Sequence, residues 1–168
     1  MTLDLGGKLG GVPELTIEPL RPEHAEPLRA LRATPEVARW WEPAAPGWPL
    51  EAEPEIEKRV LLVDGEIAGY LQFFEEPDPR NRYADVDIFL GPAHIGRGLG
   101  SEALRTIIRE LTEERGHHRI TLWTSPENER AIRCYEGLGF RRVGVTRRSE
   151  LSHVTGEWED ELFMELVV

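Results

Sequence analysis

The sequence has little cysteine, no long apolar run and no excess of positive charge. Cys134 is the single cysteine among 168 residues, so no disulfide can form within the chain. A catalytic thiol would need an activating environment, whereas a cysteine in the middle of a helix packs. We interpret Cys134 as a packing residue, with a nucleophile as the alternative.

No apolar stretch approaches the roughly eighteen residues that a membrane-spanning helix needs, so we expect no membrane partner. Residues 1–12 contain four glycines and one lysine but no apolar core, which is not the pattern of a secretory signal. We expect a flexible leader over residues 1–12, one domain over residues 13–168, and a cytoplasmic location.

Basic residues are outnumbered, with 20 Lys and Arg against 31 Asp and Glu and a net charge of −11. Proteins that bind nucleic acid carry basic patches, so we expect no nucleic-acid partner. An acidic surface is compatible with a cationic partner such as an amine.

Strand and helix patterns are interspersed along the chain, which predicts one mixed α/β domain. Strands are predicted over residues 12–20, 59–63, 66–74, 83–90, 120–124, 140–146 and 158–167. Helices are predicted over residues 22–33, 101–115 and 125–138, the last capped by Ser125 and Pro126. A further short helix starts at Thr34 and runs into two tryptophans. The pair Asp64-Gly65 predicts a β-hairpin turn.

The most informative segment is the glycine loop, residues 95–100, between the strand that ends at Leu90 and an amphipathic helix. It consists of Ile95, Gly96, Arg97, Gly98, Leu99 and Gly100. Alternate glycines leave backbone N–H groups uncovered at a helix N-terminus, where the helix dipole favours anions. The loop therefore predicts a phosphate cradle.

Two nucleotide motifs fit this loop poorly. Residues 91–98 approach the P-loop pattern, but Arg97 replaces its lysine and Gly98 replaces the Ser or Thr that ligates magnesium. Residues 98–103 match the dinucleotide fingerprint, yet the strand ends well before them and no acidic residue follows at the required place. A plain helix-packing turn is the remaining alternative, although three alternating glycines have an entropic cost that packing does not require.

A second motif, residues 128–140, has the sequence Asn-Glu-Arg-Ala-Ile-Arg-Cys-Tyr-Glu-Gly-Leu-Gly-Phe. Together the two motifs resemble the GNAT superfamily of acyl-CoA-dependent N-acyltransferases, whose loop reads Gln/Arg-x-x-Gly-x-Gly/Ala. Ile95 departs from this pattern, which affects one side-chain contact but not the backbone cradle. The resemblance implies the GNAT fold, an α/β (α+β) architecture. Its central mixed, mostly antiparallel sheet is flanked by helices, with a strand–glycine loop–helix acyl-CoA site.

Within the superfamily, residues 37–41, 86–90 and 128–140 are most similar to the aminoglycoside 6'-N-acetyltransferases and their siderophore-lysine acyltransferase relatives. Residues 156–164 resemble the end of the ribosomal-protein and polyamine acetyltransferases. The subfamily therefore stays open.

The resemblance implies acetyl-CoA as the co-substrate, and several residues around it. Backbone groups of Ile88, Phe89 and Leu90 are expected to line the pantetheine and polarise the acetyl carbonyl, and amides from Gly96 to Ser101 to hold the pyrophosphate. Arg97 is expected to reach a phosphate or to be solvated. Asn128 is expected to contact the pantetheine arm, or alternatively to be an ordinary first-turn polar residue. Tyr135 is expected to be the general acid, or alternatively a core tyrosine.

Strand alternation puts Asp85 and Asp87 on one face of a central strand, where carboxylates are costly unless paired or wet. Their proximity can raise a pKa towards the working range. We expect Asp87 to be the base or the ammonium-binding group, and Asp85 to help bind the substrate. Alternatively, both face arginines or solvent.

Three further residues are candidates for the acceptor site. Two consecutive indoles on a helix cannot both enter the core, so Trp40 or Trp41 is expected to line a cleft, where it could stack on a sugar or a cation. Helix packing is the alternative. Asp160 interrupts an apolar row on the last strand, and is either an amine-binding carboxylate or a solvated acid.

These residues predict an acetyl-CoA-dependent N-acetyltransferase for a primary amine of a cationic small molecule. The leading acceptor is an aminoglycoside 6'-amine, the chemistry of antibiotic resistance; a polyamine, a protein N-terminus and a lysine-derived siderophore precursor are alternatives. A non-catalytic acyl-CoA-binding module is the alternative of another class. No metal is expected, because His117 and His118 adjoin each other without a third ligand nearby. Family members are often monomers or homodimers, so we expect either state.

Overall fold

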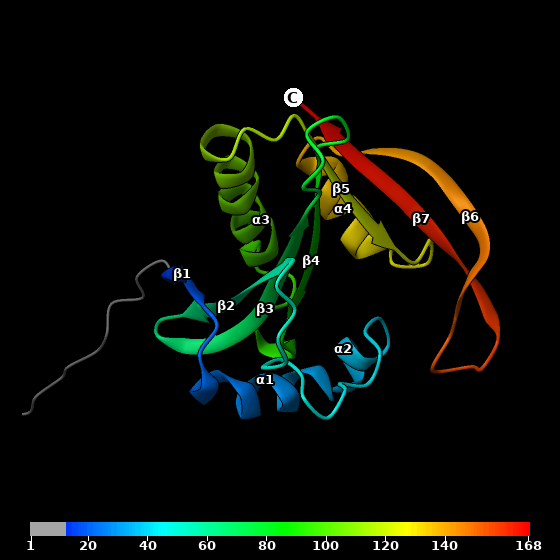
Figure 1. Ribbon diagram of the computed structural model, residues 1–168. Helices are drawn as coiled ribbons and strands as arrows, with labels where there is room; N and C mark the ends of the chain where they lie inside the picture. Colours follow the sequence, from blue (N-terminus) through cyan, green and yellow to red (C-terminus); the bar gives the residue numbers. More distant parts are fainter. Residues whose placement is uncertain (1–12) are drawn as a thin grey trace, which may run out of the picture.

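A seven-stranded sheet forms the centre of the computed structural model, which describes residues 13–168 (Figure 1). The strand order is β1-β2-β3-β4-β5-β7-β6. The strands are β1 (Leu15–Pro19), β2 (Ile56–Val63), β3 (Glu66–Glu75), β4 (Ala84–Leu90), β5 (Arg119–Thr124), β6 (Arg141–Leu151) and β7 (Trp158–Val167). Neighbours pair antiparallel except β4 and β5, which are parallel. The predicted mixed, mostly antiparallel sheet is confirmed.

Helices cover both faces of this sheet (Figure 1). The helical elements are η1 (Pro22–His24), α1 (Ala25–Arg32), α2 (Pro35–Ala38), η2 (Pro92–His94), α3 (Leu99–Arg109), the π-helical η3 (Glu110–Glu114) and α4 (Glu129–Gly137). One core lies between the sheet and the helices α3 and α4. A second core lies against α1 and α2 on the opposite face.

The alternation of β4 divides its side chains between these two cores. Val86 enters the core beneath α3 and packs with Leu104. Phe89 enters the opposite core with Tyr70 and Trp48. Because side chains alternate along a strand, Asp85 and Asp87 lie on the same face as Phe89, as predicted. The predicted hairpin at Asp64-Gly65 is also confirmed, since β2 and β3 pair up to Val63 and Glu66.

The parallel pair β4–β5 opens after a short contact. Its register contains only Ala84 opposite Ile120 and Asp85 opposite Thr121. On its other edge β4 stays paired with β3 as far as Leu90. The two central strands therefore diverge from Asp87 onward, and one backbone edge of β4 has no strand partner there.

Several helix boundaries differ from the prediction. The helix predicted over residues 101–115 begins earlier, at Leu99, and ends as an α-helix at Arg109, where the π-helical η3 follows. Ser125 and Pro126 do not cap α4, because the Ala131 N–H is satisfied by Oδ1 of Asn128 at 3.3 Å, so that the helix begins there. The Ser125 hydroxyl oxygen accepts the N–H of Glu127 in the preceding turn instead. The second short helix does not run into the tryptophans either, since α2 ends at Ala38.

The predicted leader, residues 1–12, lies outside the described residues. Within residues 13–168 no helix is both long enough and apolar enough to span a membrane.

Gly69 permits the close approach of β3 and β4. A Cβ at this position would clash with the Phe89 carbonyl oxygen and lie 3.1 Å from Leu90 Cα, against backbone that cannot move aside cheaply. We expect Gly69→Ala to lower the free energy of unfolding by about 2 to 3 kcal/mol, measured by urea denaturation. Gly144→Ala, whose Cβ would meet nothing within 4 Å, should change it by less than about 0.5 kcal/mol. Equal effects of the two substitutions would contradict this account.

Candidate functional site

A cavity of about 850 Å³, which we call the large cavity, lies where β4 and β5 diverge. One part of it, which we call the loop groove, is bounded by the β4 edge, the glycine loop and α4. Its lining includes Ile88, Phe89, Leu90, Ile95, Gly96, Gly98, Gly100, Ser101, Asn128, Ala131 and Tyr135. A second part, which we call the acidic chamber, is lined by Glu42, Glu150, Glu159 and Glu161 together with Trp40 and Trp41. Arg32 and Arg39 also line this cavity, and their guanidinium groups lie over Trp41 and Trp40.

The glycine loop presents free backbone donors to the loop groove. Gly98 is the N-cap of α3 and has φ of +79°, a left-handed conformation that favours glycine, and it supplies no side-chain cap. The first N–H groups of α3 therefore need partners from outside the helix. Gly100 and Ser101, at the start of α3, line the groove. This arrangement can hold an anion.

Two of the predicted loop residues turn away from the groove. The Arg97 guanidinium donates to the carbonyl oxygen of Ala93 at 3.5 Å, and Arg97 does not line the cavity. The side chain of Leu99 is buried with Val63 and Ala68. Their contribution to the loop is therefore limited to the backbone.

Helix α4 brings Asn128 and Tyr135 to the same groove. Asn128 uses Oδ1 for the helix cap, which leaves its amide N–H groups available. Tyr135 is buried, and its hydroxyl makes no hydrogen bond to any of residues 13–168. Burial raises the pKa of Tyr135, with the charges of Asp87 and Cys134 adding to the effect. The phenol therefore stays protonated at neutral pH.

Asp87 lies at the point where β4 leaves β5. Its Oδ2 accepts a hydrogen bond from Gln72 Nε2 at 3.0 Å, and the Tyr70 hydroxyl donates to Gln72 Oε1 at 2.9 Å. Burial raises the pKa of Asp87, opposed in part by the bond from Gln72. The positioning chain of Gln72 and Tyr70 was not foreseen, because it depends on which residues of β3 lie opposite β4.

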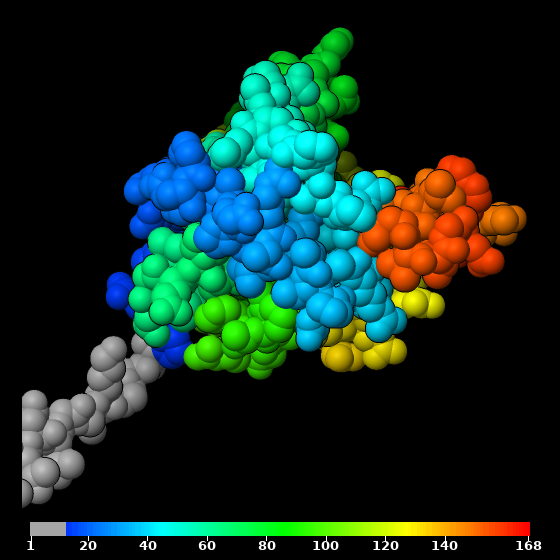
Figure 2. Space-filling model, turned by 90° about the horizontal axis from the view of Figure 1, so that it is seen from below, coloured from blue at the N-terminus to red at the C-terminus, as the bar shows by residue number. Residues whose placement is uncertain are grey.

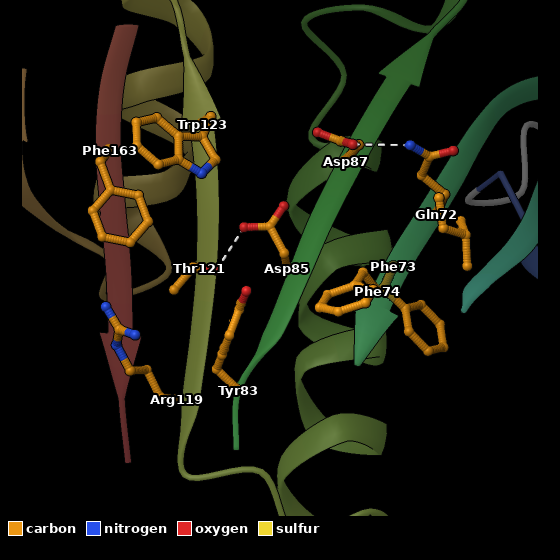
Figure 3. A pocket seen from close by; sticks show the side chains of 11 residues that line it. Gln72, Phe73, Phe74, Tyr83, Asp85, Asp87, Arg119, Thr121, Trp123 and Phe163 are labelled. Atoms are coloured by element: carbon orange, nitrogen blue, oxygen red, sulfur yellow. Dashed lines mark hydrogen bonds between the residues drawn. The ribbon is translucent and has the colours of Figure 1, made fainter. Parts of the chain in front are cut away.

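A second cavity of about 540 Å³ lies on the sheet surface, and Asp87 and Trp123 line both cavities. We call it the sheet-face cavity (Figure 3). Its lining also includes Ile56, Gln72, Phe73, Phe74, Tyr83, Asp85, Arg119, Thr121 and Phe163. Asp85 Oδ2 accepts a hydrogen bond from the Thr121 hydroxyl at 2.5 Å. Burial raises the pKa of Asp85 to about 6; the Thr121 bond opposes this rise and the charge of Asp87 adds to it.

The two predicted tryptophans both line the large cavity, although they lie in the turn after α2 and not on a helix. Trp41 packs edge-on against Phe89, with ring centroids 5.0 Å apart. Trp40 lies under the Arg39 guanidinium, 4.5 Å from the ring centroid. The tip of the β6–β7 hairpin meets α2 here, where His153 Nε2 lies 2.6 Å from the Ala38 carbonyl oxygen; in Figure 2 this orange tip adjoins the blue N-terminal helices.

Asp160 is not brought to either cavity. Its Oδ1 accepts the N–H of Arg148 at 2.8 Å, in a stretch where the pairing of β6 and β7 shifts register. The neighbouring Glu159 and Glu161 line the acidic chamber instead. Side-chain alternation along β7 puts these two glutamates on the face opposite Asp160. Which of the two faces points into the cavity depends on how the β6–β7 hairpin is oriented, and the sequence does not give that orientation.

Several other lining residues were not singled out from the sequence. Arg130 and Arg133 of α4 line the large cavity, as do residues 152–155 of the hairpin tip. The two arginines follow Asn128 within the predicted helix, so their positions next to Asn128 could have been used to predict that they line the same cavity. The sequence of the hairpin tip could not have predicted this, because the tip reaches the cavity only through tertiary packing.

Residues 19–140 match the acetyltransferase (GNAT) family. This match covers most of the chain, which therefore belongs to that family, and the predicted resemblance, fold and acyltransferase class are confirmed at this level. No group of three His, Cys, Asp or Glu that could hold a metal occurs among residues 13–168.

The chain is similar to an aminoglycoside N(6')-acetyltransferase type 1 from Klebsiella pneumoniae, 32% identical over 105 residues, which are 56% of this chain and 52% of that protein. It thus spans about half the length of this curated relative. A spermidine N-acetyltransferase from Vibrio cholerae, solved with coenzyme A and spermine, has a TM-score of 0.79 at 20% identity, covering 91% and 95% of the two chains. An aminoglycoside acetyltransferase solved with coenzyme A has a TM-score of 0.74 at 22% identity, covering 92% and 95%. At these identities the solved structures establish the fold.

The raised pKa of Asp85 predicts a pH-dependent effect on stability. Its carboxyl titrates near 3.8 in the unfolded chain and near 6 in the folded chain, so its burial costs nothing below pH 3.8 and about 3 kcal/mol above pH 6. Asp85→Asn removes that cost and keeps an acceptor for Thr121. We expect the variant to be more stable than the native protein by about 3 kcal/mol at pH 7.5, measured by urea denaturation.

At pH 4 this difference in unfolding free energy should shrink towards zero, because the native carboxyl is then protonated in the folded state. A difference of the same size at both pH values would mean that the titration of Asp85 does not cause it.

Proposed function

We propose that this protein is an acetyl-CoA-dependent N-acetyltransferase that acts on a primary amine of a cationic small molecule. The observation that carries the proposal is the large cavity, in which an anion-binding loop groove and an acidic chamber meet at Asp87 and Tyr135. The groove suits a phosphate-bearing donor, whereas the chamber suits a positively charged acceptor.

The donor would lie along the loop groove. The N–H groups at the start of α3 would hold the pyrophosphate, and Arg130 and Arg133 add positive charge nearby. The unpaired edge of β4 from Ile88 to Leu90 offers backbone groups to the pantetheine and to the acetyl carbonyl. The free amide of Asn128 lies on the α4 side of the same path.

The reaction would proceed by attack of the amine nitrogen on the thioester carbonyl carbon, with cleavage of the carbon–sulfur bond. Asp87 would bind the ammonium form and accept its proton, directly or through water, because its raised pKa makes it a stronger base than an exposed carboxylate. Tyr135 would donate a proton to the departing thiolate, since its raised pKa keeps the phenol protonated.

The leading acceptor is an aminoglycoside 6'-amine. The four glutamates of the acidic chamber suit a polycationic sugar, its two indoles offer apolar surface to a sugar ring, and the similar aminoglycoside N(6')-acetyltransferase supports this acceptor. A polyamine is the second candidate, supported by the same charge and by the fold shared with the spermidine N-acetyltransferase. A protein N-terminus, a lysine-derived siderophore precursor and a non-catalytic acyl-CoA-binding role are the remaining alternatives. The cytoplasmic location and the monomeric or homodimeric state remain part of this proposal.

The acceptor is tested by thiol release from acetyl-CoA with kanamycin, spermidine and a peptide amine. We expect the highest kcat/KM for kanamycin, because its ring suits the indoles as well as the charge. Turnover of spermidine alone would favour the polyamine acceptor, and turnover of the peptide alone would reject both. Coenzyme A binding without turnover of any amine would favour the non-catalytic role.

The catalytic roles are tested by Asp87→Asn and Tyr135→Phe. We expect Asp87→Asn to lower kcat at least about 100-fold and Tyr135→Phe about 10- to 100-fold, because each removes a proton-transfer group. Coenzyme A affinity, measured by calorimetry, should change less than about twofold. Asp64→Asn is the matched control, because this hairpin-turn carboxylate lies outside both cavities. Parallel loss of kcat and coenzyme A affinity would mean that Asp87 is structural.

A further inference from the structure

The sheet-face cavity has aromatic walls on two sides. The rings of Trp123 and Phe163 lie with centroids 4.5 Å apart, and those of Phe74 and Tyr83 lie 6.1 Å apart. Figure 3 shows Asp85 between these pairs, on the central strand. Aromatic faces attract cations, and the attraction increases when the cation is desolvated. The walls therefore suit a hydrophobic group that carries positive charge.

The charge of the cavity has the matching sign. Asp85 and Asp87 both line it, and Arg119 is the single cationic side chain among its lining residues within the described part of the chain. Arg119 is neutralised by Glu165, with Nε donating to Oε2 at 2.7 Å. Its guanidinium lies over the Phe163 and Tyr83 rings, 5.6 and 5.9 Å from their centroids, so a ligand cation would use the remaining aromatic surface. The cavity therefore keeps excess negative charge beside the two aspartates.

The two carboxylates are held apart in a defined way. Asp87 is bonded to Gln72 of β3, whereas Asp85 is bonded to Thr121 of β5, so the two side chains turn towards opposite neighbouring strands (Figure 3). Their Cα atoms are two residues apart on one strand face, a separation of about 7 Å. Because the two carboxylates turn towards different neighbouring strands, a short chain with two ammonium groups can place one group on each of them.

Asp87 also links this cavity to the proposed reaction site. It lines both the sheet-face cavity and the large cavity, as does Trp123. An amine bound at Asp87 therefore faces the loop groove, while the rest of the same molecule has access to the sheet-face cavity.

We propose that Asp85 and the aromatic walls of the sheet-face cavity bind a second cationic group of the acceptor, so that the enzyme selects amines with a second positive charge one short chain away from the reacting nitrogen. This inference rests on the proposed function, in which Asp87 binds the reacting amine. Asp85 is then a specificity-determining residue and Asp87 a catalytic one. Binding of a cation also relieves the repulsion between the two carboxylates.

The test compares 1,4-diaminobutane with n-butylamine, which lacks the second charge. Binding to the full chain saturated with coenzyme A is measured by calorimetry at pH 7.5, and kcat/KM is measured with acetyl-CoA. We expect the native protein to bind the diamine about 10- to 100-fold more tightly than the monoamine. Asp85→Asn should remove this preference, because it should weaken diamine binding far more than monoamine binding. Phe163→Leu, at a residue that lines the sheet-face cavity and not the large cavity, should weaken diamine binding a few-fold.

Asp64→Asn, the same chemical change outside both cavities, should keep the preference. Absence of a preference in the native protein, or an equal loss for both amines in Asp85→Asn, would overturn the inference. The binding measurement separates it from the proposed function. Diamine binding that depends on Asp85, without turnover, would support the subsite and contradict the proposed enzyme activity. Turnover without a diamine preference would support the enzyme activity and contradict the subsite.

Discussion

The parallel pairing of β4 and β5 is the constraint on which the site depends. Each of the other neighbouring pairs in the sheet is antiparallel, and this pair has register contacts only at residues 84–85 and 120–121. Because β4 continues to Leu90 along β3, the opening between β4 and β5 is fixed by the sheet itself. A rigid strand thus presents unpaired backbone to one cavity and the Asp87 carboxylate to both. Neither a mobile loop nor a domain boundary is needed to form the site.

Much of the fold follows from local sequence. The turn Asp64-Gly65, the alternation of β4 and the amphipathic pattern of α3 are each set by residues within one element, so the sequence predicted them and the structure confirms them. The glycine loop belongs to the same group, because a left-handed N-cap residue and an uncovered helix N-terminus are local properties. The loop by itself fitted several nucleotide motifs; the motif at residues 128–140 supplied the resemblance, and the family match confirms it.

The remainder of the site depends on contacts between distant segments. The hydrogen bond from Gln72 to Asp87 depends on the register of β3 against β4. The presence of Glu159 and Glu161 in the cavity lining, and the absence of Asp160 from it, depend on the irregular pairing of β6 and β7. The tryptophans were expected on a helix that ends before them, because residues 39–41 contain no glycine or proline that would mark the end of α2 at Ala38. The sheet-face cavity has no counterpart in any single motif, because its walls come from five strands.

Asp85 and Asp87 occupy positions where the pattern of the sheet favours apolar residues. The same face of β4 carries Phe89 into an aromatic core with Tyr70, which includes residues of α1 and α2. A branched apolar residue at position 85 or 87 would extend this packing. It would also avoid the free-energy cost of burying a carboxylate, the same burial that raises the pKa of Asp85 and of Asp87. The fold accepts two carboxylates facing open space instead, each held by one hydrogen bond from a neighbouring strand. Two departures from the local rule at one place in an otherwise consistent sequence are what the proposed binding of a cationic acceptor would explain.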